Sequence, residues 1–137
     1  MGRYGTFFVW DAVFFFYRDL KTADKKEIAR DLYKTTYGNL DSWLRCCTDL
    51  RNICAHYGRL YYRVFSAVPA TPKGFPVVLR RSLFDNIVML RFLYPDRDRW
   101  NSEVLSAIIA LLEEYAGDIE LSHIGFPDNW EELLRAK

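Results

Sequence analysis

Hydrophobic residues recur every three or four positions along most of the chain, a spacing typical of amphipathic α-helices. Strand-like alternation is scarce, and a proline-rich stretch at 69–76 predicts a loop. With its capping and breaking residues, the pattern predicts helices at about 6–20, 24–37, 41–57 or beyond, 77–93, 102–116 and after Pro127. We therefore expect a single all-α domain over residues 1–137, a bundle of about five to six helices.

Individual residues set the expected ends of these helices. Asp24 is expected to start the second helix with capping-box spacing, and Gly38 is expected to end it. A cap on Asn101 or Ser102 would begin the fifth helix, and a cap on Asp128 would begin the last.

The third helix carries two stripes of different character. Apolar and cysteine side chains recur along one side at Trp43, Cys47, Leu50, Cys54, Tyr57 and Tyr61. Polar side chains recur with the same spacings on nearly the opposite side at Arg45, Asp49, Asn52, His56, Arg59 and Arg63. If the helix continues to residue 63, its apolar stripe is buried and its arginine-rich stripe faces outward with a histidine in the middle.

Arg51, Asn52 and His56 form a compact set for RNA phosphate chemistry. Histidine can give or take a proton near neutral pH, and arginine holds a phosphate with a planar, permanently charged group. Asn52 lies one turn from His56 on the same face and could orient the reacting groups. A solvated histidine among solvated arginines would give the same spacing, so the spacing leaves both interpretations open.

Arg51 does not share the polar stripe of the third helix. On an ideal helix it lies about 140° from His56, so a single straight helix cannot easily direct both side chains at one phosphate. A distorted helix, a curled Arg51 side chain or a second chain would each remove this misfit. We interpret it as an indication of a composite site in a dimer.

Charge is unevenly distributed along the chain. The formal net charge of +1 argues against a protein that is basic over its whole surface. Residues 43–99, however, hold ten Lys and Arg against four Asp, whereas residues 113–132 hold seven acidic residues and no Lys or Arg. A local basic surface on a nearly neutral protein is therefore expected.

The three cysteines, Cys46, Cys47 and Cys54, suit a reducing cytoplasm rather than a disulfide framework. We expect them to be small buried residues rather than zinc ligands, and we expect no metal or other cofactor. The apolar stretch at 7–17 is too short to cross a membrane, and no secretory signal pattern is present.

Four aromatic or imidazole groups have less specific interpretations. His123 is expected to have a structural role, and the pair Tyr61-Tyr62 could either pack or stack on bases. Trp130 in the last helix is expected to anchor the core.

The stretch Arg51-Asn52-Ile53-Cys54-Ala55-His56-Tyr57-Gly58-Arg59-Leu60, followed by Arg63, resembles the Abi-like family of bacterial abortive-infection proteins (AbiD/AbiF type). That family carries a stretch of the form R-N-x-x-A-H-x-x-R-L. The stretch 40–44, the stretch 124–127 and Trp130 resemble flanking and C-terminal signatures of the family. By this resemblance, the chain corresponds to the C-terminal half of a full-length member.

The resemblance implies a HEPN-type helical bundle that acts as a metal-independent endoribonuclease. By the family pattern, Arg51, Asn52 and His56 are catalytic, and Arg59, Arg63 and Tyr57 contact RNA. The implied reaction is attack of the ribose 2′-hydroxyl on the adjacent phosphate, leaving a cyclic phosphate end. The implied assembly is a homodimer that joins two motifs in one site, and the implied role is cytoplasmic phage defence.

The chain also departs from the family pattern. Tyr57 stands where many members carry a second histidine, and Tyr61-Tyr62 replaces a Trp-Asn pair. Gly58 stands where some HEPN toxins carry a modifiable tyrosine, so that form of regulation is not expected. Two alternatives remain open: a non-catalytic RNA-binding HEPN domain, and a protein-interaction module with an antitoxin or regulator as its partner.

Overall fold

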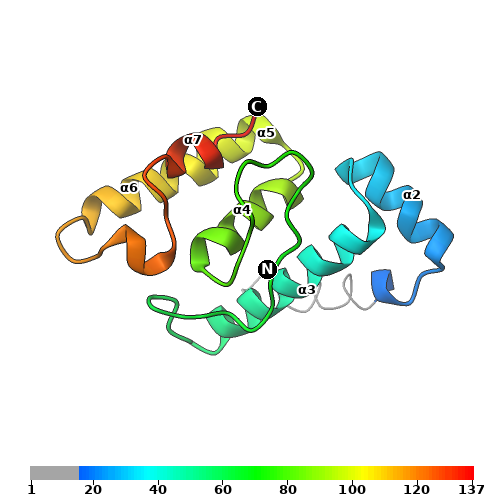
Figure 1. The fold of residues 1–137 in the computed structure, drawn as a ribbon, viewed down its shortest axis with the longest axis horizontal. Helices are drawn as coiled ribbons and strands as arrows, with labels where there is room; N and C mark the ends of the chain where they lie inside the picture. Colours follow the sequence, from blue (N-terminus) through cyan, green and yellow to red (C-terminus); the bar gives the residue numbers. More distant parts are fainter. Residues whose placement is uncertain (1–15) are drawn as a thin grey trace, which may run out of the picture.

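The computed structural model describes residues 16–137 and consists of helices joined by turns and loops (Figure 1). Its elements are α2 (Thr22–Tyr33), α3 (Tyr37–Ala55), α4 (Leu83–Leu93), α5 (Arg97–Arg99), the π-helix η1 (Trp100–Leu105), α6 (Ser106–Glu114), the 3₁₀-helix η2 (Leu121–Ile124) and α7 (Trp130–Leu134). No described residue lies in a strand, so the all-α prediction is confirmed there. Of the helix expected at about 6–20, residues 16–18 are helical and residues 1–15 lie outside the described part.

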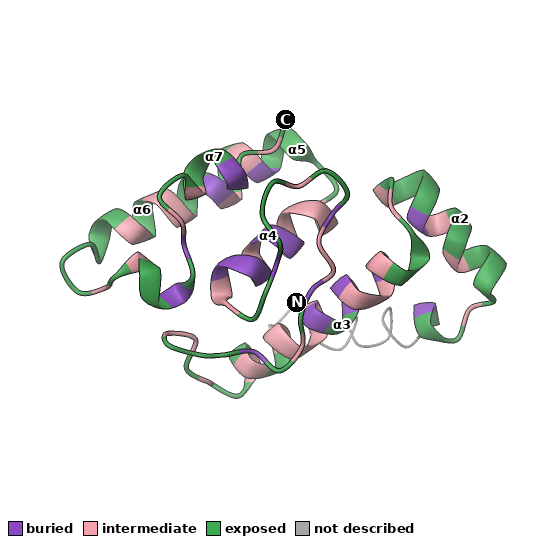
Figure 2. Ribbon diagram, viewed as in Figure 1, coloured by how far each residue is buried: buried purple, intermediate pink, exposed green. Residues whose placement is uncertain are grey.

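Helix α4 lies between the two halves of the described structure. In Figure 1, α2 and α3 lie on one side of α4, and α5, α6 and α7 lie on the other. The N-terminal core on the first side comprises Tyr17, Ala29, Leu40, Trp43, Leu44, Cys46 and Met89. The C-terminal core on the second side comprises Leu79, Phe84, Val88, Trp100, Leu105, Ile124, Phe126, Leu133 and Leu134. Figure 2 accordingly shows more buried positions on α4 than on the peripheral helices α2 and α6.

The turn between α2 and α3 differs from the prediction. Helix α2 begins at Thr22 without a side-chain cap and ends at Tyr33, where Lys34 adopts a left-handed conformation with φ of 54°. Thr36 then caps α3, because its hydroxyl accepts a hydrogen bond from the Asn39 amide at 3.2 Å. The predicted boundaries at Asp24 and Asp41 are therefore wrong, and Gly38 lies in the first turn of α3 rather than at the end of α2.

Helix α4 begins at a capping box rather than near residue 77. The Ser82 hydroxyl accepts a hydrogen bond from the Asp85 amide, and the Asp85 carboxylate accepts from the Ser82 amide and hydroxyl. The predicted end before Pro95 is confirmed, since α4 ends at Leu93.

The next helical segment begins earlier than predicted. The Asp96 carboxylate caps it by accepting from the Arg99 amide at 3.0 Å, and α5, η1 and α6 follow one another without a break. The expected cap on Asn101 or Ser102 is therefore wrong. Asn101 instead binds the C-terminal segment, because its side-chain amide donates to the Ala136 carbonyl and accepts from the Ala136 amide, both at 2.8 Å.

The chain end is helical but differs in detail. The 3₁₀-helix η2 was not predicted, and α7 begins at Trp130 after Asn129, so the cap expected on Asp128 is wrong. Trp130 is half-buried and packs on Phe126 with ring centroids 5.5 Å apart. No helix in the described part of the chain is long and apolar enough to cross a membrane.

The connection from His56 to Ser82 is long and irregular but is tied to α3. The Ser42 hydroxyl donates to the Val68 carbonyl and accepts from the Ala70 amide, and the Trp43 indole donates to the Ala70 carbonyl at 2.7 Å. The loop predicted at 69–76 is therefore confirmed, and it packs back onto the helix from which the connection departs. Irregular connections of this length in compact domains are often functional.

Candidate functional site

The candidate site lies where α3 ends. His56 is the C-cap residue, and its amide donates to the Asn52 carbonyl at 3.1 Å. The Tyr57 amide then donates to the Cys54 carbonyl, and the Gly58 amide donates to the Ile53 carbonyl. This pair of hydrogen bonds is a Schellman motif, which terminates the helix. Helix α3 therefore ends close to the predicted boundary at about residue 57, and it does not continue to residue 63.

Two residues of the motif allow this termination. Tyr57 occupies the left-handed position with φ of 55°, where glycine is usual, although its side chain is 93 % exposed. Gly58 lies so close to α3 that an added Cβ would be 2.6 Å from Ile53 Cγ2 and 2.9 Å from the Ile53 carbonyl oxygen. Strained residues of this kind are often found at functional sites.

The three predicted catalytic residues lie together in the last turns of α3. Asn52 and His56 are exposed, and Arg51 is half-buried. Helix α3 continues through Ala55, so the side chains of Asn52 and His56 are one helical turn apart. Arg51 lies on a different side of the helix. The structure therefore places an exposed polar pair beside a half-buried arginine, and the angular misfit seen in the sequence persists in a single chain.

Arg59 and Arg63 do not extend the polar stripe, because they lie in the loop beyond α3. Arg59 Nε donates to the Tyr61 carbonyl at 3.2 Å, and its guanidinium lies over the Tyr62 ring at 6.0 Å. Arg63 Nε donates to the Arg59 carbonyl at 2.6 Å. Both side chains are exposed and positively charged, so they remain candidates for phosphate binding from a loop rather than from a helix.

The predicted apolar stripe of α3 is correct only in its first half. Trp43 is buried and Cys47 is half-buried, but Cys54 and Tyr57 are exposed. The expectation that all three cysteines are buried is therefore wrong for Cys54. Burial raises the pKa of the Cys46 thiol and of the Cys47 thiol to about 11 each.

Tyr61 and Tyr62 bring the loop into contact with η2. The Tyr61 hydroxyl accepts a hydrogen bond from the Glu120 amide at 3.1 Å and lies 3.1 Å from His123 Nδ1. His123 Nε2 lies 3.0 Å from the Glu120 carboxylate, and the Tyr62 ring stacks on the imidazole with centroids 4.6 Å apart. His123 therefore joins the loop after α3 to a segment more than 60 residues further along the chain.

An open groove of about 800 Å³ lies between this loop, residues 76–82 and η2. Its charged and aromatic lining comprises Tyr62, Arg63, Arg80, Arg81, Phe84, Asp85 and His123. The Asp85 carboxylate is buried and already bonded to Ser82, so the accessible charge of the described lining is positive. The groove thus combines arginines with the exposed ring of Tyr62, which suits a nucleic-acid strand.

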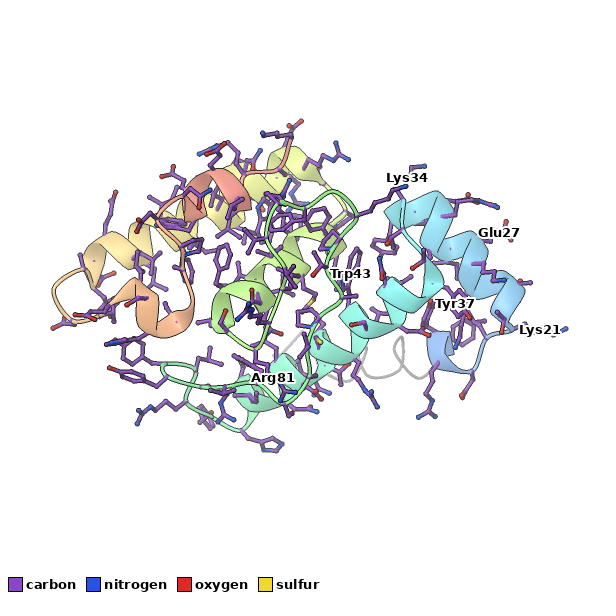
Figure 3. All side chains as sticks on the ribbon, in the orientation of Figure 1. Lys21, Glu27, Lys34, Tyr37, Trp43 and Arg81 are labelled. Carbon is purple, nitrogen blue, oxygen red and sulfur yellow. The ribbon has the colours of Figure 1, made fainter. Side chains whose placement is uncertain are left out.

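Arg80 and Arg81 were missed in the sequence analysis. The two adjacent arginines were the available signal, but they fell inside the helix predicted at 77–93 and were therefore not considered as a separate basic site. Figure 3 labels Arg81, which lies near the end of the connection and outside α4. Within the described chain, no group of three or more His, Cys, Asp or Glu side chains is placed to hold a metal ion.

Comparison with known families gave one result. A family model described as Abi-like protein matches residues 6–62, somewhat less than half of the 137 residues. The match includes Arg51, Asn52, His56 and Arg59 and ends before Arg63, and it supports an Abi-like family assignment. No curated protein and no solved structure matches the chain.

Proposed function

Taking the Abi-like assignment as the premise, we propose that this protein is a metal-independent endoribonuclease of the HEPN type that acts in abortive infection. The observation that carries the proposal is the end of α3, where Asn52 and His56 are exposed one turn apart and Arg51 is adjacent in sequence. All three residues lie within the family match. The set supplies a proton-transfer group, a phosphate-binding cation and a hydrogen-bonding amide.

The proposed reaction is a transesterification within the RNA strand. His56 takes the proton of the ribose 2′-hydroxyl, whose oxygen attacks the adjacent phosphorus. The bond from phosphorus to the 5′ oxygen of the next nucleotide breaks, and that oxygen takes its proton from the same His56, which is now protonated. The products are a 2′,3′-cyclic phosphate and a 5′-hydroxyl end. Arg51 stabilises the negative charge that develops on the phosphate, and Asn52 orients it.

A homodimer is part of the proposal. Arg51 and His56 lie on different sides of α3, so one chain does not direct both at the same phosphate. Two copies related by a twofold axis would bring Arg51 of each chain to His56 of the other, because a twofold interface uses the same surface on both chains. The exposed position of His56 at the end of α3 leaves it accessible to a second chain.

The groove beside the loop is the proposed path of the RNA strand. Arg63, Arg80 and Arg81 would contact phosphates, and Tyr62 would stack on a base. The guanidinium groups of Arg59 and Arg63 are held partly by main-chain carbonyls, which fixes their direction. Tyr57, exposed next to His56, is a further RNA contact. Because these contacts replace counterions, RNA binding should weaken steeply as the salt concentration rises.

A non-catalytic interaction module is the second candidate, and one observation favours it. Several large apolar side chains near the loop are exposed, namely Tyr57 at 93 %, Val64 at 75 % and Val78 at 69 %. Exposed apolar groups of this kind are typical of protein-binding surfaces. A partner such as an antitoxin or regulator could occupy this surface with or without ribonuclease activity.

The test is RNA cleavage in EDTA by the wild type, His56→Ala and Arg51→Ala. Arg45→Ala is the matched control, because Arg45 is an exposed arginine of the same helix outside the motif. Loss of a general acid or base should lower the cleavage rate by about 10²–10⁴-fold, and Arg45→Ala should leave it unchanged. Analysis of the product ends should find the cyclic phosphate. No cleavage by the wild type, or equal cleavage by every variant, would contradict the catalytic proposal.

Mixing the two inactive variants tests the composite site separately. In a heterodimer of His56→Ala with Arg51→Ala, one of the two composite sites contains only native residues. Random exchange of subunits should therefore restore about a quarter of the wild-type activity in a symmetric dimer. Sites built within single chains would show no recovery.

A further inference from the structure

A second basic cavity lies away from the end of α3, between α2, α4, α5 and the C-terminal segment. Its volume is about 480 Å³. Five positively charged residues line it, namely Lys34, Lys73, Arg91, Arg97 and Lys137. No described residue of the lining is acidic, and none of Arg51, Asn52 and His56 takes part. The cavity is therefore a concentrated positive site separate from the proposed ribonuclease site.

The cations of this cavity are bonded to main-chain oxygens, and no acidic side chain is part of the described lining. Arg91 is half-buried on α4, and its Nη1 donates to the Leu133 carbonyl at 2.8 Å. Arg97 donates to the main-chain carbonyl of Lys137, and Lys34 Nζ donates to the Asp31 carbonyl at 3.1 Å. These oxygens fix the directions of the side chains, and the carbonyls of Leu133 and Asp31 leave the charges of Arg91 and Lys34 in place.

The proximity of these cations has an electrostatic cost. Burial and the nearby charge of Arg97 lower the pKa of the Arg91 guanidinium. Like charges gathered at a partly buried site destabilise it unless an anion offsets them. The arrangement therefore favours a bound anion with more than one negative charge.

The rest of the cavity wall is aromatic and apolar. Tyr33, Trp43, Phe92 and Tyr94 contribute to it, and the Arg91 guanidinium lies over the Phe92 ring at 4.7 Å. Figure 3 shows two of the contributors from different helices, Lys34 at the end of α2 and Trp43 on α3. A planar ring could lie against such a wall while the charged groups hold an anion. The volume lies in the range of about 300–1,000 Å³ that small-molecule sites occupy.

We propose that this cavity binds a nucleoside phosphate, with the phosphates on Lys34, Lys73 and Arg97 and the base against the aromatic wall. The cations recognise the phosphates, because arginine and lysine bind these groups strongly. The aromatic side chains distinguish a nucleotide from a simple anion. Binding would join the turn after α2 to the C-terminal segment.

The experiment measures binding of ATP, AMP and pyrophosphate by calorimetry in EDTA at low salt. The variant is Lys73→Gln with Arg97→Gln, since both side chains are exposed and their replacement should leave the fold intact. Arg99→Gln is the matched control, because Arg99 belongs to the same short helix α5 but pairs with Glu103 at 3.2 Å and does not line the cavity. Thermal unfolding of each variant checks that it is folded.

We expect ATP to bind, AMP and pyrophosphate to bind more weakly, and the double variant to lose at least tenfold in affinity for ATP. Arg99→Gln should stay within twofold of the wild type. No ATP binding at millimolar concentration, or equal binding by the folded double variant, would overturn the proposal. Pyrophosphate that binds as tightly as ATP would overturn the role of the aromatic wall.

One further ligand separates the two sources of a nucleoside phosphate. A 5′-phosphorylated RNA trinucleotide that binds more tightly than AMP would assign the cavity to an RNA end, and weaker binding would assign it to a free nucleotide. These measurements use His56→Ala protein, so that cleavage cannot affect them. Failure of nucleotide binding would therefore leave the ribonuclease proposal unaffected, and absence of RNA cleavage would leave the nucleotide-binding proposal unaffected.

Discussion

The loop that follows α3 and the C-terminal segment, which here comprises α7 and residues 135–137, are held in different ways. Where it leaves α3, the loop is fixed by its own backbone and near neighbours, through the Schellman motif and the hydrogen bonds of Arg59 and Arg63. Tyr61 and Tyr62 add contacts with Glu120 and His123. The C-terminal segment is fixed by side chains from distant helices: Arg91, Trp100 and Asn101 bind the carbonyls of Leu133, Leu134 and Ala136. Tyr57, Arg59 and Tyr62 are exposed in the loop, whereas Leu133 and Leu134 of the C-terminal segment are buried in the core.

This difference indicates how the chain separates stability from chemistry. Because main-chain hydrogen bonds hold the end of α3, the side chains of Asn52, His56 and Tyr57 are left exposed at the surface. Its local strain at Tyr57 is tolerated because the C-terminal core contributes stability elsewhere. Substitutions in the two regions should therefore have effects of different size and sign.

The largest effect is expected for Trp100→Ala. Trp100 is 2 % exposed and its indole donates to the Leu134 carbonyl at 2.7 Å. Removing it leaves a cavity and an unsatisfied carbonyl, so the free energy of unfolding should fall by about 3–5 kcal/mol. Urea unfolding measures this change, and Trp100→Phe should lose less because the ring is retained. If Trp100→Ala lowers the free energy of unfolding by less than Gly58→Ala does, the proposed difference between the two regions is wrong.

A smaller loss is expected for Gly58→Ala in the loop after α3. The new methyl carbon would lie 2.6 Å from Ile53 Cγ2 and 2.9 Å from the Ile53 carbonyl oxygen. The close packing of residue 58 against the end of α3 would therefore be lost. We expect a loss of about 1–3 kcal/mol in the free energy of unfolding. The control is Gly38→Ala at the other end of α3, where nothing lies within 4 Å of an added Cβ. That change should be neutral or mildly stabilising.

The smallest effect, and the one of opposite sign, is expected for Tyr57→Gly. Glycine relieves the left-handed strain at φ of 55° but loses more backbone entropy on folding. The net gain in the free energy of unfolding should be roughly 0.5–1 kcal/mol, seen as a higher urea midpoint. Tyr57→Ala should not give this gain because it keeps Cβ. A loss of stability on Tyr57→Gly would show that the exposed ring contributes to the fold.

Sequence patterns predicted the helical class and the proline-marked loop, because both follow from local preferences. The pattern left the end of α3 open between residues 57 and 63, because the spacing of three and four continues through Tyr57 and Tyr61 although the helix does not. Gly58 was the available signal, since a glycine soon after a helix can allow the chain to turn. Periodicity alone does not distinguish a helix that continues from a loop with the same composition.

The motif residues lie at the end of α3, where His56 is the C-cap, and their catalytic roles stay predictions. The partners of the loop could not be predicted, because Tyr61 and His123 are 62 positions apart. The basic cavity was equally hidden, since its cations come from five separate segments of the chain. Such sites arise from tertiary packing rather than from local pattern.

The ties between Ser42, Trp43 and the loop at Val68 and Ala70 have a kinetic consequence. They join residues 26–28 positions apart, so they can form only after a long stretch of chain has closed on itself. Helix α3 can form quickly from local contacts, whereas the connection that follows it must wait for this closure. During refolding, the helical signal should therefore recover before the environment of Trp43 does.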